Sequence, residues 1–260
     1  MAASQQDKAN AFRALHRGPC FVIPNPWDAG SAKALAGLGF AALATSSGAA
    51  AGVLGRRDGE ITRDEALAHA RAIVAATDLP VAADLENGFG DAPADAALTI
   101  RLAGENGLVG GSIEDCSGVA ARRVYGLNQA VDRIAAAAEA ARALPFAFTL
   151  TARCENFLRG HPDLDDTIRR LQAYERAGAD VLFAPALPDL GAVRTVCASL
   201  SKPLNFMVGI KGKSFSEAEL SDAGVRRISL ATSMYRAAMA GLMQAATEAR
   251  QGGFTYVERL

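Results

Sequence analysis

Eight short apolar segments alternate with eight helix-like segments along nearly the whole chain, and this alternation restricts the possible folds more than any other feature. The apolar segments cover residues 20–24, 40–46, 80–84, 108–115, 146–153, 181–186, 203–208 and 226–232. The helical candidates lie near residues 28–38, 63–77, 93–106, 128–143, 163–177, 189–200, 216–223 and 233–250. Nearly continuous apolar segments are typical of parallel strands covered on both faces. The count predicts an α/β (β/α)8 TIM barrel, and a doubly wound open sheet is the alternative.

Composition narrows the functional classes. Half of the 260 residues are apolar, and 27 basic side chains face 28 acidic ones, so charge gives no reason to expect a nucleic-acid partner. No apolar segment reaches the roughly 20 residues that a membrane-spanning helix needs. The polar N-terminus lacks a signal core, and the four cysteines are scattered without a C-x-x-C pair. We therefore expect one cytoplasmic domain over residues 1–260, with reduced thiols and no membrane partner.

Polar side chains gather where the predicted strands end. The segment "VAADLENGFGD" places Asp84 and Glu86 at the end of one strand, and Glu114 ends the next. Residues two apart on an extended strand point to the same side, and the carboxyl ends of barrel strands carry the functional groups. Three carboxylates at close range repel one another unless a cation lies among them. Oxygen ligands favour Mg²⁺ or Mn²⁺.

Two alternatives for these residues stay open. The carboxylates can instead pair with Arg153, or with Arg122 and Arg123. The segment "TSSGAA" at residues 45–50 either supplies backbone N–H donors to an anion or is a turn that needs a glycine.

Four motifs in order, "VAADLENGFGD", "SIED", "TARCEN" and "RAGADVLFAP", resemble the isocitrate lyase/phosphoenolpyruvate mutase superfamily. The segments "NPWDAGSAKALAGLGFAALATSSGA" and "GRRDGEITRDEALAHARAI" also resemble its members, so the likeness covers nearly the whole chain. It implies a (β/α)8 barrel that acts on a small carboxylate through a Mg²⁺-bound enolate. Such enzymes cleave C–C bonds, rearrange or hydrolyse P–C bonds, or hydrolyse or decarboxylate oxaloacetate.

The resemblance also implies roles for individual residues. The implied metal shell is Asp84 as direct ligand, with Glu86, Glu114 and Asp58. The implied substrate-binding residues are Ser47, Gly48, Ala49, Arg153 and Asn205, and the implied catalytic residues are Arg153 and Glu114. Glu86 stands where the family usually has an aspartate.

The reaction-determining loop departs from the family. Lyases of this family carry a Lys-x-Cys-Gly loop, whereas this chain has "IEDCSGVAARRVYGLNQAVDRI". Cys116, Tyr125 and His161 are the other proton-transfer candidates near the predicted strand ends. We expect a Mg²⁺-dependent lyase or mutase-type enzyme for a small 2-oxo or 2-hydroxy carboxylate such as oxaloacetate, phosphonopyruvate or a malate. The alternative is a vestigial barrel that binds a dicarboxylate as a sensor. The family likeness further implies a homo-oligomer, a dimer or tetramer, whose C-terminal helix can pack on a neighbouring subunit.

Overall fold

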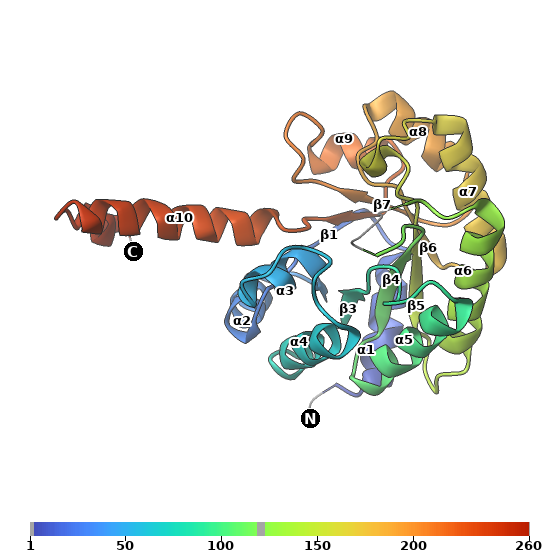
Figure 1. The fold of residues 1–260 in the computed structure, drawn as a ribbon, viewed down its shortest axis with the longest axis horizontal. Coiled ribbons are helices and arrows are strands. Elements are labelled where there is room, and N and C mark those ends of the chain that lie inside the picture. The colour runs from blue at the N-terminus through green and yellow to red at the C-terminus, as the bar shows by residue number, and fades with distance from the viewer. Residues whose placement is uncertain (1–2, 119–122, 260) are drawn as a thin grey trace.

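The computed structural model describes residues 3–118 and 123–259, and within them parallel strands form a nearly closed barrel (Figure 1). The strands are β1 Phe21–Ile23, β2 Leu43–Ala44, β3 Val81–Asp84, β4 Gly110–Glu114, β5 Thr149–Arg153, β6 Val181–Phe183, β7 Leu204–Met207 and β8 Arg227–Ser229. Their order in the sheet is β1-β8-β7-β6-β5-β4-β3-β2. The N–H of Ala44 donates to the carbonyl of Pro24 over 3.1 Å, which links the two ends of the sheet. The predicted (β/α)8 barrel is confirmed.

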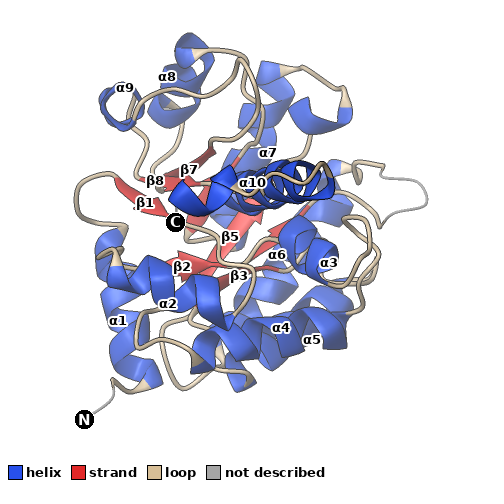
Figure 2. Ribbon diagram, turned by 90° about the vertical axis from the view of Figure 1, so that its left-hand side faces the viewer, coloured by secondary structure: helices blue, strands red, loops and turns tan. Residues whose placement is uncertain are grey.

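Helices surround the sheet (Figure 2). They are α1 Gln5–Leu15, α2 Ala29–Gly37, α3 Ser47–Val53, α4 Arg63–Ala75, α5 Pro93–Glu105, α6 Leu127–Arg142, α7 Leu164–Ala177, α8 Leu190–Ala198, α9 Glu217–Asp222 and α10 Ser233–Arg250. Two short 3-10 helices are η1 Phe157–Arg159, between β5 and α7, and η2 Thr255–Arg259, after α10. The sequence analysis missed α1 and α3. Of the two, α3 is short and occupies the segment where a turn was one of the predictions.

Local signals explain where helices begin and end. Thr62 caps α4 by accepting the N–H of Glu65, whose side chain returns to the Thr62 N–H, so two free donors are satisfied. Asp163 caps α7 by accepting the N–H of Asp166, and Gly178 ends that helix with a φ of 110°. A glycine suits that left-handed position because it has no side chain to strain the backbone.

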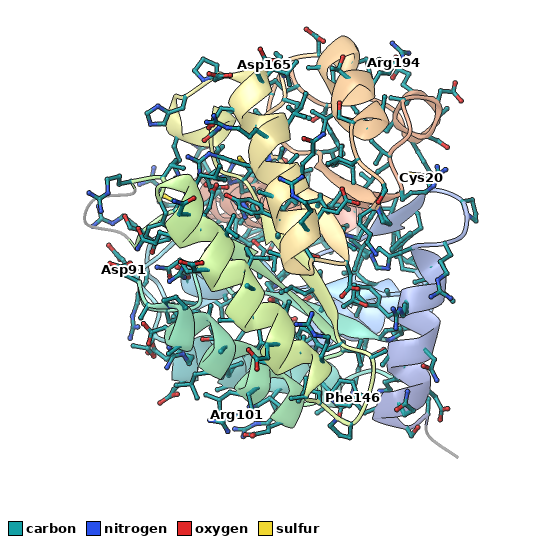
Figure 3. All side chains as sticks on the ribbon, turned by 90° about the vertical axis from the view of Figure 1, so that its right-hand side faces the viewer. Cys20, Asp91, Arg101, Phe146, Asp165 and Arg194 are labelled. Atoms are coloured by element: carbon teal, nitrogen blue, oxygen red, sulfur yellow. The ribbon has the colours of Figure 1, made fainter. Side chains whose placement is uncertain are left out.

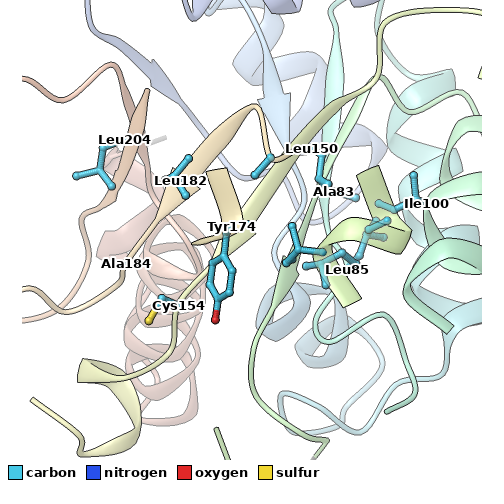
Figure 4. Close-up of a cluster of buried hydrophobic side chains, with 14 of the residues drawn as sticks. Ala83, Leu85, Ile100, Leu150, Cys154, Tyr174, Leu182, Ala184 and Leu204 are labelled. Atoms are coloured by element: carbon cyan, nitrogen blue, oxygen red, sulfur yellow. The ribbon is translucent and has the colours of Figure 1, made fainter. Parts of the chain in front are cut away.

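Successive side chains along the strands point alternately to the apolar core between sheet and helices and to the inside of the barrel. Leu150 of β5, Leu182 of β6 and Leu204 of β7 belong to the large apolar core between sheet and helices (Figure 4). Their neighbours Thr151, Asn205 and Arg227 line the inside of the barrel. The barrel lumen therefore holds polar groups among apolar side chains, and Asp84 and Arg153 line its end nearest the carboxyl ends of the strands.

The last long helix stands apart from the barrel. Figure 1 shows α10 extending away from the other elements, and no residue of this helix is buried. Leu242 and Met243 are 56% and 62% exposed. In the described part of the chain, no helix has both the length and the apolar character needed to cross a membrane.

Candidate functional site

A cavity of about 350 Å³ opens at the carboxyl ends of the strands. Its charged and hydroxyl-bearing lining residues include Ser46, Ser47, Asp58, Asp84, Glu86, Glu114, Arg153, Arg159 and Arg236. Gly48 lines it as well. The structure thus gathers most of the predicted site residues in one place.

One serine joins two of the predicted metal-shell carboxylates. The Ser47 hydroxyl lies 2.7 Å from Oδ1 of Asp58 and 3.0 Å from Oδ2 of Asp84. The backbone N–H of Ser47 also donates to Asp84, over 3.3 Å. A hydroxyl has a single proton to donate, so it can serve only one of the two carboxylates at a time. A cation between the carboxylates would remove that conflict.

Glu86 reaches the cavity by a different route from the one expected. We expected an extended strand through both acidic residues, but β3 ends at Asp84 and Glu86 has a φ of 49°. That expectation was wrong because the chain turns at once, with the N–H of Glu86 donating to Oδ1 of Asp84 over 3.3 Å. Gly88 completes the turn, and a Cβ there would lie 2.9 Å from the Cα of Ala96. Both carboxylates nevertheless line the same cavity.

Arg153 lies among the acidic groups. Its Nη1 is 3.8 Å from Asp84 Oδ2, and its Nε is 3.6 Å from Glu114 Oε2. Its shortest ion pair, 2.5 Å, joins Nε to Oε1 of the fully buried Glu155. Arg153 thus forms ion pairs with the carboxylates that the alternative named. The alternative does not hold for Arg123, which forms no ion pair in the described part of the chain, and Arg122 lies outside the described residues.

Three charged residues of this cluster, Glu155, Arg159 and Arg236, were missed in the sequence. Arg159 of η1 places Nη2 2.7 Å from Glu155 Oε2 and 3.8 Å from Glu114 Oε1. Glu155 thus holds two arginines at the cavity wall. The signal was the polar run "RCENFLR", where Glu155 and Arg159 stand four residues apart. Arg236 enters from the first turns of α10 and is exposed.

The electrostatics of the wall reflect an excess of negative charge. Burial raises the pKa of Glu114 well above its usual value, and the neighbouring carboxylates Glu155 and Asp84 raise it further, against the opposite effect of Arg153 and Arg159. Four carboxylates line the cavity beside three guanidinium groups, and Glu155 adds a fifth carboxylate beneath them.

The oxygen-rich lining fits a hydrated hard cation better than an enclosed metal cage. Carboxylate and hydroxyl oxygens are the donors that Mg²⁺ and Mn²⁺ prefer. Among the described residues, no three Asp, Glu, His or Cys side chains lie close enough to enclose a metal ion. Mg²⁺ commonly keeps several waters and takes only one or two protein carboxylates. Asp58 and Asp84, which share the Ser47 hydroxyl, offer carboxylates for that kind of contact.

Two predicted substrate-binding residues lie elsewhere. Ala49 is fully buried in α3, and its N–H donates to the Ser46 hydroxyl over 3.4 Å. The expectation of a simple turn at residues 45–50 was wrong, because Ser46 caps this helix and Ser47 begins it. Asn205 lies deeper, in a lumen cavity of about 70 Å³ that Asp84 and Arg153 also line. Its Oδ1 accepts from Arg227 Nε over 2.8 Å.

The three other proton-transfer candidates do not line the cavity. Cys116 is fully buried, and burial raises the pKa of its thiol to about 11. Tyr125 is buried and donates to Asp91 over 2.5 Å, and burial raises its pKa to about 12. His161 lines a separate cavity together with Arg123. All four cysteines are free thiols, as predicted.

Comparisons with known proteins agree with this architecture. The family described as phosphoenolpyruvate phosphomutase matches residues 12–250. A crystal structure from Burkholderia cenocepacia J2315, provisionally named a lyase/mutase, is 53% identical, covers 98% of this chain and 92% of its own, and superposes with a TM-score of 0.96. The 2,3-dimethylmalate lyase structure is 28% identical, covers 95% and 89% of the two chains, and has a TM-score of 0.86. The 2-methylisocitrate lyase of Bacillus subtilis is 29% identical over 96% of this chain and 86% of its own. The chain therefore belongs to the phosphoenolpyruvate phosphomutase family, within the isocitrate lyase/phosphoenolpyruvate mutase superfamily.

Proposed function

We propose that this protein is a divalent-metal-dependent enzyme of the lyase or mutase type that acts on a small 2-oxo or 2-hydroxy carboxylate. The observation that carries the proposal is the meeting of Asp58, Asp84, Glu86 and Glu114 with Arg153 in one cavity at the carboxyl end of the barrel. Relatives named as lyases of 2-methylisocitrate and 2,3-dimethylmalate support the reaction class. Oxaloacetate-, malate- and phosphonopyruvate-like compounds are the substrates we propose.

The metal shell would use the oxygen donors already in place. Asp84 would bind Mg²⁺ or Mn²⁺ directly, with Asp58, Glu86 and Glu114 acting through water. The cation, when bound, supplies stabilisation of negative charge that develops on a substrate oxygen.

Arg153 would orient the substrate carboxylate. Glu155 occupies its Nε, which fixes the plane of the guanidinium group and leaves its terminal N–H groups for a ligand. Paired N–H donors bind a carboxylate with defined geometry. The backbone N–H groups of Ser47 and Gly48 would hold the same carboxylate, with the Ser47 N–H leaving Asp84 Oδ2, to which it donates over 3.3 Å without a ligand. Gly48 is required there for space, because a Cβ would lie 2.8 Å from Thr232 Cγ2 and 3.4 Å from Asp58 Cγ.

Cavity size and charge define the substrate further. A volume of about 350 Å³ lies at the small end of ligand pockets. Arg159 and Arg236 place two further cations on the lining, which suits a second anionic group on the substrate. We therefore favour compact dianions over larger tricarboxylates.

Oxalate, a mimic of a pyruvate enolate, tests the proposal. Calorimetric titration with oxalate should show tight binding only when Mg²⁺ or Mn²⁺ is present. Asp84→Asn should abolish the metal-dependent part of oxalate binding. Asp165→Asn is the matched control, because Asp165 is an exposed residue of α7. Turnover would be followed with oxaloacetate, phosphonopyruvate, 2-methylisocitrate and 2,3-dimethylmalate. Loss of metal dependence in the wild-type titration would refute the metal site, and metal-dependent binding without turnover of any compound would favour the sensor alternative.

We also propose that the protein is a homo-oligomer in which α10 packs on a neighbouring subunit. A helix with no buried residue and exposed Leu242 and Met243 presents apolar surface to water, and such surface is commonly an interface. The cytoplasmic location stays a prediction from the sequence.

A further inference from the structure

A second and larger cavity, about 670 Å³, lies at the opposite end of the barrel from the candidate active site. It is bounded by the starts of β5 and β6, the segments before β7 and β8, the end of α1, and the helices α8 and α9. Five basic residues line it: Arg13, Arg17, Arg194, Lys202 and Arg226. Figure 3 shows Arg194 at the surface of α8. None of the residues assigned to the candidate active site reaches this cavity.

The basic residues of this cavity outnumber its acidic ones, although Arg13 and Lys202 are close enough to Asp180 to lower its pKa against the effect of burial. Only Asp180 and Asp222 contribute carboxylates to the lining, which leaves a surplus of three positive charges. In the described part of the chain, none of the five basic side chains forms an ion pair. Asp180 accepts the backbone N–H of Leu150 over 3.0 Å. Because the whole chain carries 27 basic and 28 acidic residues, this surplus is a local feature.

The wall of the cavity also contains a buried hydroxyl without a partner. Thr149, at the start of β5, is 3% exposed, and its Oγ1 has no hydrogen-bond partner among the described residues. Leaving a buried hydroxyl without a hydrogen bond is unfavourable. A polar ligand at this wall could form one with the Thr149 hydroxyl without breaking a hydrogen bond of the fold. His16 lines the same cavity and adds no charge, because burial and the nearby Arg227 lower its pKa to about 3.

We propose that this cavity binds a small polyanion carrying phosphate or pyrophosphate groups. Four of its five cations are arginines, whose planar forks match phosphate oxygens with paired N–H donors. The cavity volume falls in the range of small-molecule sites and is larger than the volume that one inorganic anion fills. The surplus of three positive charges suits a ligand with several negative charges. The site is independent of the proposed reaction, because it shares no side chain with the cavity at the other end.

Calorimetric titration with inorganic pyrophosphate, in buffer with a chelator and without divalent metal, tests this site. We expect one pyrophosphate per chain, weaker binding of citrate, and unchanged pyrophosphate binding in Arg236→Gln, which removes a cation from the cavity at the other end. The variant Arg194→Gln/Arg226→Gln should bind pyrophosphate at least about tenfold more weakly, because it removes two of the charged donors. Arg176→Gln is the matched control, since Arg176 is an exposed residue in the last turn of α7 and does not line the cavity.

Two further variants keep the test decisive. If the double variant has a lower melting temperature than the wild type by circular dichroism, Lys202→Gln repeats the binding test at another cation of the cavity. Thr149→Val removes a hydroxyl that no group of the fold uses, so it should weaken pyrophosphate binding severalfold without lowering the melting temperature. The proposal is overturned if pyrophosphate does not bind, or if Arg236→Gln or Arg176→Gln weakens binding as much as the double variant does.

Discussion

Lowering the pH should destabilise the protein through one residue, His16. This imidazole is 7% exposed, and its Nδ1 lies 2.9 Å from the carbonyl of Phe12 while its Nε2 lies 3.2 Å from Nη1 of Arg227. Because the carbonyl can only accept and the guanidinium can only donate, Nδ1 carries the proton and Nε2 accepts. A second proton on the ring would break the bond to Arg227 and place two positive charges side by side.

The size of the effect follows from the pKa. Burial, together with the charge of Arg227, lowers the pKa of His16 from 6.5 to about 3. The unfolded chain therefore takes up a proton as the pH falls below 6.5, whereas the folded chain takes it up only near pH 3. Within that window the free energy of unfolding drops by about 1.4 kcal/mol per pH unit, or about 2 kcal/mol between pH 7 and pH 5. Above pH 6.5 both states are neutral, and the contribution of His16 to stability is complete.

Urea unfolding of the wild type and of His16→Gln at pH 7, 6 and 5 measures this contribution. A glutamine amide oxygen can still accept from Arg227, but it does not titrate. His69, whose pKa burial also lowers, is present in both proteins, so its effect cancels in the difference. The stability advantage of the wild type over the variant should shrink by about 2 kcal/mol from pH 7 to pH 5. A difference that stays constant with pH would refute a neutral buried His16.

Three further predictions test other parts of the molecule. Glu155→Gln should cost about 3 kcal/mol of stability and weaken metal-dependent oxalate binding, because two arginines lose a buried counter-charge; unchanged urea unfolding and oxalate titrations would contradict this. Tyr174→Phe should cost about 1–3 kcal/mol in urea unfolding, because it leaves Asp115 without a buried 2.5 Å hydrogen bond. Leu242→Asp/Met243→Asp should lower the molar mass measured by light scattering, and an unchanged mass would contradict packing of α10 on a neighbouring subunit.

The fold could be predicted from the sequence because parallel strands and covering helices leave a repeated pattern in the chain. Each of the eight predicted strands contains one observed strand. The segments overestimated strand length, as in residues 40–46, where only Leu43–Ala44 pairs. Such residues are buried for reasons other than pairing: Thr45 and Ser46 line the barrel lumen rather than extend the strand.

The site was predictable only to the extent that strand ends determine it. Asp84, Glu114 and Arg153 end their strands, so topology alone brings them together. Arg236 could not be found in this way, because it reaches the cavity from a helix whose direction the sequence does not specify. The sequence also did not show how far below the barrel opening a side chain lies. Asn205 sits one residue into β7 and therefore lies in the lumen below the cavity.

Arg227 explains why Asn205 lies where it does. This buried guanidinium donates to Asn205 Oδ1, to Thr151 Oγ1 over 3.0 Å and to His16 Nε2, all of them neutral acceptors. Burial lowers its pKa to about 9, so it still carries its charge at neutral pH. The amide of Asn205 in turn donates one N–H to Ser229 over 3.0 Å. With its oxygen bound to Arg227 and one hydrogen bound to Ser229, Asn205 has a single N–H left for the cavity above. That N–H can donate to a substrate oxygen, which is the polarity that a developing negative charge requires.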